Sequence, residues 1–255
     1  MTISLKGTGL AIFLLSATAC TSHYTLTDVS RQRVVIDKRY DSNPDKSTTL
    51  FLAPYKQKVD AVMSPVLGHV ARDMVANRPE SDLSNLLADI LMWAAKDYNE
   101  KPVLAVYNMG GIRAALTKGP VTYGNVLAVA PFENKIAFTT LKGTDLLELF
   151  KQIAHRGGEG VSRGVQLVIS EKGDLLSARL NGQEIDPQAS YRVTTIDYLV
   201  QGNDGMPAFK NGTDLVAPQE DSNNSRFIIM NYFKAKEAKG ETVDSQVEGR
   251  IVLQK

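Results

Sequence analysis

The sequence contains few histidines and cysteines, the residues that most often bind transition metals or form disulfides. Its 255 residues include one cysteine and three histidines. A single cysteine has no partner for an intramolecular disulfide. His23, His69 and His155 lie far apart, without the spacing of metal ligands, whereas a dinuclear metal hydrolase needs several histidines and carboxylates at one site. We therefore predict no metal or other cofactor site in this chain.

An excess of one charge is also lacking. The 29 Lys and Arg residues nearly balance the 28 Asp and Glu residues, which gives a formal net charge of +1. This balance argues against nucleic-acid binding, which depends on many basic contacts to phosphates. The sequence has neither a Gly-x-Gly-x-x-Gly dinucleotide motif nor a Gly-Lys-Ser/Thr phosphate loop. We recognise no nucleophilic triad, so the sequence does not indicate a self-sufficient catalytic apparatus, and whether the chain is an enzyme is left open.

The N-terminus has the pattern of an export signal. Lys6 provides a positive charge, residues 10–15 form a short apolar core, and residues 17–19 resemble a cleavage site. The apolar core is far shorter than the ~20 residues that a membrane-spanning helix needs. We therefore expect residues 1–19 to be a signal peptide and the protein to be exported.

Cys20 directly follows the expected cleavage site. The combination resembles a bacterial lipoprotein signal, in which lipid on Cys20 anchors the exported chain in a membrane of the cell envelope. The lack of a second cysteine favours this interpretation, because exported cysteines commonly pair in disulfides. An ordinary secretory signal with an incidental cysteine is the alternative.

Hydrophobic periodicity predicts a mixture of helices and strands after the signal. Residues 20–45 are expected to be a tether that includes an edge strand at 33–37, and residues 46–255 to be one domain. The expected helices are 44–63 (bent at Pro54), 82–98, 122–129, 144–156 and 225–238. The expected strands are 66–70, 103–107, 135–141, 165–169, 176–180, 191–196 and 250–253.

The order of these elements predicts the fold class. Helices and strands do not alternate strictly, and tight turns at 172–174 and 181–182 join successive strands after residue 160. This arrangement is typical of an α+β domain with largely antiparallel sheets. The glycine-rich residues 158–164 are expected to form a mobile loop.

The segment 108–113, Asn-Met-Gly-Gly-Ile-Arg, is the first candidate for a binding site. It follows the apolar run 103–107. Paired glycines allow a ligand to approach the backbone closely, and Arg113 just beyond them is placed to bind a phosphate, a carboxylate or a ring edge. On spacing alone, a strand-to-loop turn with a structural arginine is the alternative.

Two aromatic residues and an aspartate lie beside predicted turns. Phe132 belongs to the Pro-containing turn 130–134, and Tyr198 precedes the glycine-containing loop 201–205. Rings in such positions can stack on both faces of a planar ligand. Asp204 can accept hydrogen bonds from vicinal hydroxyl groups. The alternatives are that the rings pack the loops onto the core and that Asp204 bonds its own turn.

These residues, in this order, resemble the C-terminal domain of the 5'-nucleotidase family. The matching segments are 108–113, 125–132, 198–205 and 247–251. The resemblance extends over about residues 46–253, and four motifs in order at compatible distances make it specific. It implies a domain that recognises a nucleoside or nucleotide.

The resemblance also implies a role for each candidate residue. Phe132 and Tyr198 would sandwich the nucleobase, and Asn108 would contact its edge. Arg113 would reach toward the phosphate, and Asp204 would hold the ribose.

Gly110 and Gly111 would form the loop that carries the asparagine. Arg78 corresponds only loosely to a further family arginine, because it lies one position closer to Glu80 than the family pattern requires.

Full-length members of this family carry a metallophosphatase domain with two metals. The ~45 residues that precede the predicted domain are too few for one. The resemblance therefore implies recognition, and it does not imply hydrolysis by this chain alone. Our first hypothesis is that the chain works with a separate metallophosphatase chain, a partner that would hold the divalent metals. Two alternatives remain open, a cell-surface nucleotide-binding protein without a hydrolase partner and a degenerate domain kept as a scaffold.

Overall fold

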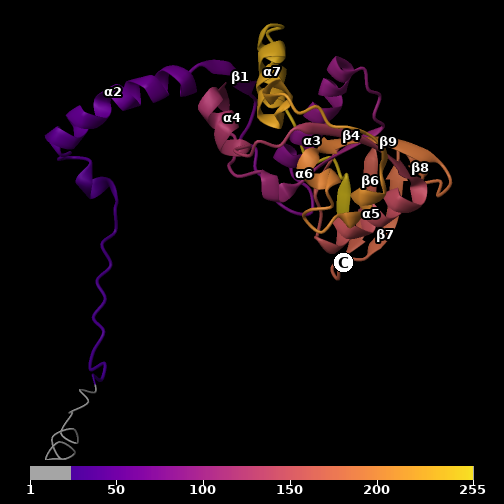
Figure 1. Ribbon diagram of the computed structural model, residues 1–255, viewed down its shortest axis with the longest axis horizontal. Helices are drawn as coiled ribbons and strands as arrows, with labels where there is room; N and C mark the ends of the chain where they lie inside the picture. Colours follow the sequence, from indigo (N-terminus) through magenta and orange to yellow (C-terminus); the bar gives the residue numbers. More distant parts are fainter. Residues whose placement is uncertain (1–23, 255) are drawn as a thin grey trace, which may run out of the picture. The chain divides into compact units, whose positions relative to one another are not determined.

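The computed structural model describes residues 24–254. The chain divides into an N-terminal unit that ends at Phe51 and a C-terminal unit that begins at Leu52. A 3-10 helix, η1 (Lys38–Tyr40), lies in the first unit, and helix α2 (Lys46–Met63) contains both the boundary and Pro54 (Figure 1). Neither helix has a buried residue.

The edge strand predicted for residues 33–37 is wrong. These residues form no strand, and all of them are exposed. Their apolar side chains, Val34, Val35 and Ile36, are consecutive, so they do not give one face that a neighbouring strand could cover.

The C-terminal unit contains five α-helices and four 3-10 helices among the described residues. The α-helices are α3 (Asp82–Ala94), α4 (Tyr123–Val129), α5 (Gly143–His155), α6 (Asp197–Val200) and α7 (Ser225–Glu237). The 3-10 helices are η2 (Ala95–Tyr98), η3 (Met109–Gly111), η4 (Pro207–Asn211) and η5 (Asp221–Asn223).

The strands of this unit form three sheets. A five-stranded sheet has the order β10-β4-β9-β2-β5, a four-stranded sheet has the order β11-β6-β7-β8, and β1 pairs with β3. The strands are β1 (Val66–Val70), β2 (Leu104–Tyr107), β3 (Gly119–Thr122), β4 (Ile136–Lys142), β5 (Gly160–Val161), β6 (Val165–Ser170), β7 (Leu175–Leu180), β8 (Gln183–Glu184), β9 (Ser190–Ile196), β10 (Thr213–Val216) and β11 (Ile251–Gln254).

Most strand pairs are antiparallel, and two are parallel. The parallel pairs are β2 with β9 and β6 with β11. The other pairs, of which β4 with β9 has the longest register, are antiparallel. The predicted α+β class with largely antiparallel sheets is confirmed.

Helix α3 supplies much of the core beneath the five-stranded sheet. Ser81 caps it in a reciprocal capping box with Ser84. Its apolar residues recur at steps of three and four, and they are buried against β2 and α7. The helix ends at Ala94 and continues as η2, so the prediction of helical structure to Tyr98 is confirmed.

The register of the central strands brings three loops to one edge of the sheet. Strands β2 and β9 are parallel, so the residues after both strands lie at the same edge. Strand β4 runs antiparallel to β9, with Ile136 opposite Ile196, so the loop before β4 also lies there. These connections contain the segments 108–113, 130–134 and 198–205, which are the three that the sequence singled out.

The prediction of a mobile loop at residues 158–164 is wrong. Residues 160–161 form β5, which pairs with β2, and residues 158–162 are buried. The glycines allow close packing: a Cβ on Gly158 would lie 2.1 Å from the carbonyl oxygen of Pro79. Glycine at this position therefore serves backbone approach rather than flexibility.

Candidate ligand-binding site

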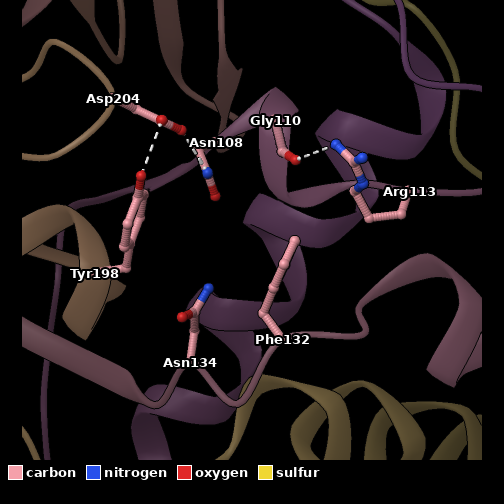
Figure 2. A pocket seen from close by; sticks show the side chains of 7 residues that line it. All are labelled: Asn108, Gly110, Arg113, Phe132, Asn134, Tyr198 and Asp204. Carbon is pink, nitrogen blue, oxygen red and sulfur yellow. Dashed lines mark hydrogen bonds between the residues drawn. The ribbon is translucent and has the colours of Figure 1, made fainter. Parts of the chain in front are cut away.

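A pocket of about 370 Å³ lies where these three loops meet (Figure 2). Its lining residues are Asn108, Gly110, Arg113, Phe132, Asn134, Tyr198 and Asp204. Six of these seven were predicted from the sequence as site residues. The structure thus brings together residues that are up to 96 positions apart, as for Asn108 and Asp204. Their role in binding stays a prediction.

The two aromatic rings flank the pocket from opposite sides. Figure 2 shows Tyr198 on one side of the space and Phe132 on the other. Phe132 is 46% exposed and Tyr198 is 36% exposed. Rings that served only to pack loops onto the core would be buried, so this exposure favours the interpretation that the rings contact a ligand.

Asp204 lies at the upper end of the pocket in Figure 2, in a left-handed backbone conformation with φ of 52°. That region is unusual for residues other than Gly, Asn and Asp. The carboxylate accepts hydrogen bonds from Asn108 Nδ2 at 2.6 Å and from the Tyr198 hydroxyl at 3.2 Å. Asp204 therefore bonds the side chain of Asn108 from another loop and that of Tyr198 from helix α6, rather than its own turn.

This carboxylate changes the acidity of the neighbouring phenol. The negative charge of Asp204 is the largest cause that raises the pKa of Tyr198, and the shift is opposed by the nearby Arg156. Tyr198 thus keeps its proton and remains a hydrogen-bond donor to Asp204 at neutral pH.

Asn108 forms the floor of the site. It is buried, and while its Nδ2 donates to Asp204, its Oδ1 is a buried acceptor with no hydrogen-bond partner among the described residues. An unsatisfied buried acceptor is costly and calls for an explanation such as a ligand donor. Gly111, which does not line the pocket, packs beneath this amide: a Cβ on Gly111 would lie 2.6 Å from Asn108 Oδ1.

Arg113 is exposed at the rim of the pocket. Its Nη1 donates to the carbonyl oxygen of Gly110 at 3.3 Å, and it forms no ion pair with any carboxylate of the described residues. The guanidinium thus retains donors for an anion, which favours a binding role over that of a structural arginine.

Arg78 does not line this pocket. Its Nε donates to the carbonyl oxygen of Gly158 at 2.8 Å, and its Nη2 donates to Glu159 Oε1 at 2.5 Å. These contacts hold the loop before α3 against the loop before β5.

Three residues at or beside the site were missed by the sequence interpretation. Asn134 lines the pocket between the two rings, and its place two residues after Phe132 in the same turn could have indicated it. Arg156 and Glu159 lie next to the pocket, and no local motif marks them.

A serine motif that the sequence interpretation did not recognise forms no nucleophilic site. Residues 160–164 have the spacing Gly-x-Ser-x-Gly, but Ser162 is buried, and its Oγ accepts a hydrogen bond from the Ala105 N–H at 2.8 Å.

Within residues 24–254, no group of three or more His, Cys, Asp or Glu residues is arranged to hold a metal ion. No helix in the same range has both the length and the apolar character to span a membrane. The predicted signal peptide and Cys20 lie outside the described residues.

The fold and the pocket together define an α+β domain with a pocket that is lined by two exposed aromatic rings and by polar groups. The family model of the 5'-nucleotidase C-terminal domain matches residues 64–211. The chain belongs to this family, as the resemblance predicted.

Known proteins are similar to this chain over much of its length. Cell wall protein Lmo0130 of Listeria monocytogenes is 25% identical over 234 residues, which are 82% of this chain and 29% of Lmo0130. The 5'-nucleotidase of Vibrio vulnificus is 28% identical over 190 residues, 71% of this chain and 33% of that protein. The chain thus spans about a third or less of these relatives.

A solved structure is similar in fold as well as in sequence. The crystal structure of the 5'-nucleotidase precursor from Thermus thermophilus has a TM-score of 0.71 and 27% identity. The similarity covers 84% of this chain and 44% of that chain.

Proposed function

We propose that this protein is a recognition domain of nucleotide catabolism that binds a nucleoside or nucleotide in the pocket of Figure 2. The observation that carries the proposal is the pocket itself, in which two exposed rings lie on opposite sides of the space beside a buried amide with an unsatisfied acceptor. The identity of the family, which the 5'-nucleotidase of Vibrio vulnificus shares, supports this ligand class.

Each part of the ligand has a partner in this arrangement. The base stacks between Phe132 and Tyr198, which contributes ~1–3 kcal/mol per ring. The edge of the base lies against the Asn108 amide. The ribose hydroxyls donate to the oxygens of Asp204, and a phosphate accepts hydrogen bonds from Arg113.

The chain acts, in this proposal, together with a separate metallophosphatase. That partner would hold the divalent metals and the attacking water, while this chain holds the nucleoside. The similarity to a cell wall protein supports export, and lipid on Cys20 would keep the exported chain at an envelope membrane.

Calorimetric titration of the soluble chain from Thr21, without metal, tests the binding site. Phe132→Ala should lower the affinity for both adenosine and AMP by at least about fivefold, because it removes one stacking face. Arg113→Ala should lower the affinity for AMP and leave the affinity for adenosine nearly unchanged. Arg179→Ala removes an exposed arginine on β7, outside the pocket, and should change neither. Equal binding of adenosine by the wild type and Phe132→Ala would contradict the proposed site.

Phosphate release from AMP tests the division of labour. The purified chain alone is expected to release none with divalent metals, and a metallophosphatase that lacks its own C-terminal domain should release more when the chain is added. Metal-dependent hydrolysis by this chain alone would show that no partner is needed.

A further inference from the structure

Glu159 is a fully buried carboxylate beside the pocket, with a side-chain exposure of 0%. Its Oε1 accepts hydrogen bonds from Arg78 Nη2 at 2.5 Å and from Arg156 Nε at 2.6 Å. Its Oε2 accepts one from the backbone N–H of Met109 at 2.5 Å. Both oxygens are therefore engaged, and two of the three donors carry a positive charge, which makes these bonds strong and directional.

These bonds connect Glu159 to two polar groups of the pocket by two separate routes. Met109 directly follows Asn108, so its N–H fixes the backbone that carries the Asn108 amide. On the other route, Arg156 Nη2 lies 4.0 Å from Asp204 Oδ2. That same oxygen accepts the hydrogen bond from Asn108 Nδ2 at 2.6 Å. The contacts thus form a closed circuit that starts and ends at Glu159.

The position of Arg156 determines how many acceptors Asp204 offers. While its Nε is bound by Glu159, its Nη2 stays beyond hydrogen-bond distance of Asp204. The lone pairs of Asp204 then serve Asn108, Tyr198 and a further donor. Without the charge of Glu159, Arg156 would be free to move into hydrogen-bond distance of Asp204, because Asp204 is the other carboxylate beside this guanidinium.

We propose that Glu159 is a positioning residue for nucleoside recognition. It does not line the pocket, but it orients Asn108 and keeps Asp204 available to the ribose hydroxyls. This inference rests on the proposed function for its ligand, whereas the positioning of Asn108 and Asp204 is a property of the free protein.

A structural ion pair elsewhere in the fold provides a matched control. Arg192 donates to both oxygens of Glu100, with its Nε at 2.8 Å and its Nη2 at 2.5 Å. Neither residue lines the pocket. Glu100→Gln therefore removes a charge from a multiply bonded carboxylate, as Glu159→Gln does, without touching the circuit.

The first measurement needs no ligand. Hydrogen exchange of the Asn108 side-chain amide, followed by NMR on the folded protein, reports its bond to Asp204. Exchange should accelerate by at least about tenfold in Glu159→Gln, the effect of losing ~1.4 kcal/mol of protection, and should not change in Glu100→Gln. Both variants are expected to melt at a lower temperature, so melting alone does not distinguish the roles. Unchanged exchange in folded Glu159→Gln would overturn the inference.

Glu159→Asp serves if Glu159→Gln does not fold. It keeps the charge between the two arginines but is one methylene shorter, so it cannot reach both Arg156 and the Met109 N–H. Exchange of the Asn108 amide should accelerate in this variant as well, and wild-type exchange would contradict the proposal.

The second measurement compares adenosine with adenine. Glu159→Gln should lower the affinity for adenosine by at least about tenfold and lower the ratio of adenosine to adenine affinity. The reason is that Arg156 then donates to the Asp204 oxygens that would accept from the ribose. Glu100→Gln should keep the wild-type ratio. If the wild type binds neither compound, the proposed function fails, and the exchange measurement still decides the role of Glu159. If Glu159→Gln binds adenosine as the wild type does, its role in recognition is refuted.

Discussion

Gly111 leaves no room for a side chain beneath the Asn108 amide. An alanine Cβ there would lie 2.6 Å from Asn108 Oδ1, so the amide must move, and its bond to Asp204 would be strained or lost. We expect Gly111→Ala to lower the affinity for adenosine by at least about tenfold and to lower the free energy of unfolding by about 1–3 kcal/mol. Calorimetric titration and denaturant unfolding measure the two effects.

The adjacent glycine provides the control. A Cβ on Gly110 would meet Asp204 Oδ2 at 3.4 Å, an ordinary contact, so Gly110→Ala should be the milder change in both measurements. An order of effects in which Gly110→Ala is the more severe would contradict the proposed packing of Asn108.

The titration of Tyr198 reports the charge of Asp204 directly. Asp204 raises the pKa of this phenol, so Asp204→Asn should lower the pKa toward its ordinary value of ~10. Because the folded-state pKa is raised, the stability from this interaction is fully present below the unfolded-state pKa. It is lost as the pH rises through the folded-state pKa. NMR titration of the Tyr198 ring measures the shift, and an unchanged pKa in Asp204→Asn would show that the carboxylate is not its cause.

The aromatic residues of the site were predictable because an aromatic ring beside a turn has little local reason to be there. Phe132 lies in a Pro-containing turn, and Tyr198, in α6, precedes the glycine-containing segment that holds Asp204. Asp is common in turns, so the resemblance to the family, rather than local sequence, distinguished Asp204. Glu159 could not be predicted, because its importance depends on Arg78 and Met109, which are 81 and 50 positions away. A sequence reveals local context, whereas a buried carboxylate is defined by its distant partners.

Helices α2 and α3 differ in how many of their residues are buried. Both have apolar residues at helical spacing, but none of the residues of α2 is buried, whereas most of those of α3 are. Val59→Ser on α2 should therefore change the free energy of unfolding by less than about 0.5 kcal/mol, and Leu87→Ala on α3 should lower it by about 2–5 kcal/mol. Denaturant unfolding of both variants tests this, and a large loss in Val59→Ser would show that α2 is packed.

Elements with strong periodicity were predicted well, and short ones were not. Helices α3 and α5 follow the expected spans, because apolar steps of three and four over several turns are hard to produce by chance. Strands β5 and β8 have two residues each, too few for any period, and β10 is exposed throughout. Such strands form because a neighbouring strand offers unpaired backbone groups, which local sequence does not record.

The arrangement of the whole molecule depended on pairings that the sequence did not predict. Residues 108–189, 82 in number, separate strands β2 and β9 in the sequence, and the parallel pairing of these strands brings the loops of the site together. The α+β class followed from the order of elements, but the choice of neighbours in the sheet did not. The resemblance to a family, rather than periodicity, is what allowed the pocket to be predicted.

Attachment to the cell envelope is a property of the whole molecule, and in our proposal it depends on Cys20. If lipid on Cys20 anchors the exported chain, the protein should incorporate labelled fatty acid and sediment with membranes, because buried acyl chains contribute ~0.8 kcal/mol per methylene. Cys20→Ser should abolish incorporation and leave the chain in the soluble fraction or unprocessed. Thr21→Ala, which changes the adjacent residue and keeps the cysteine, should behave as the wild type. A wild-type chain that carries no label and stays soluble would favour the ordinary secretory signal, and the nucleoside site would then work free of the membrane.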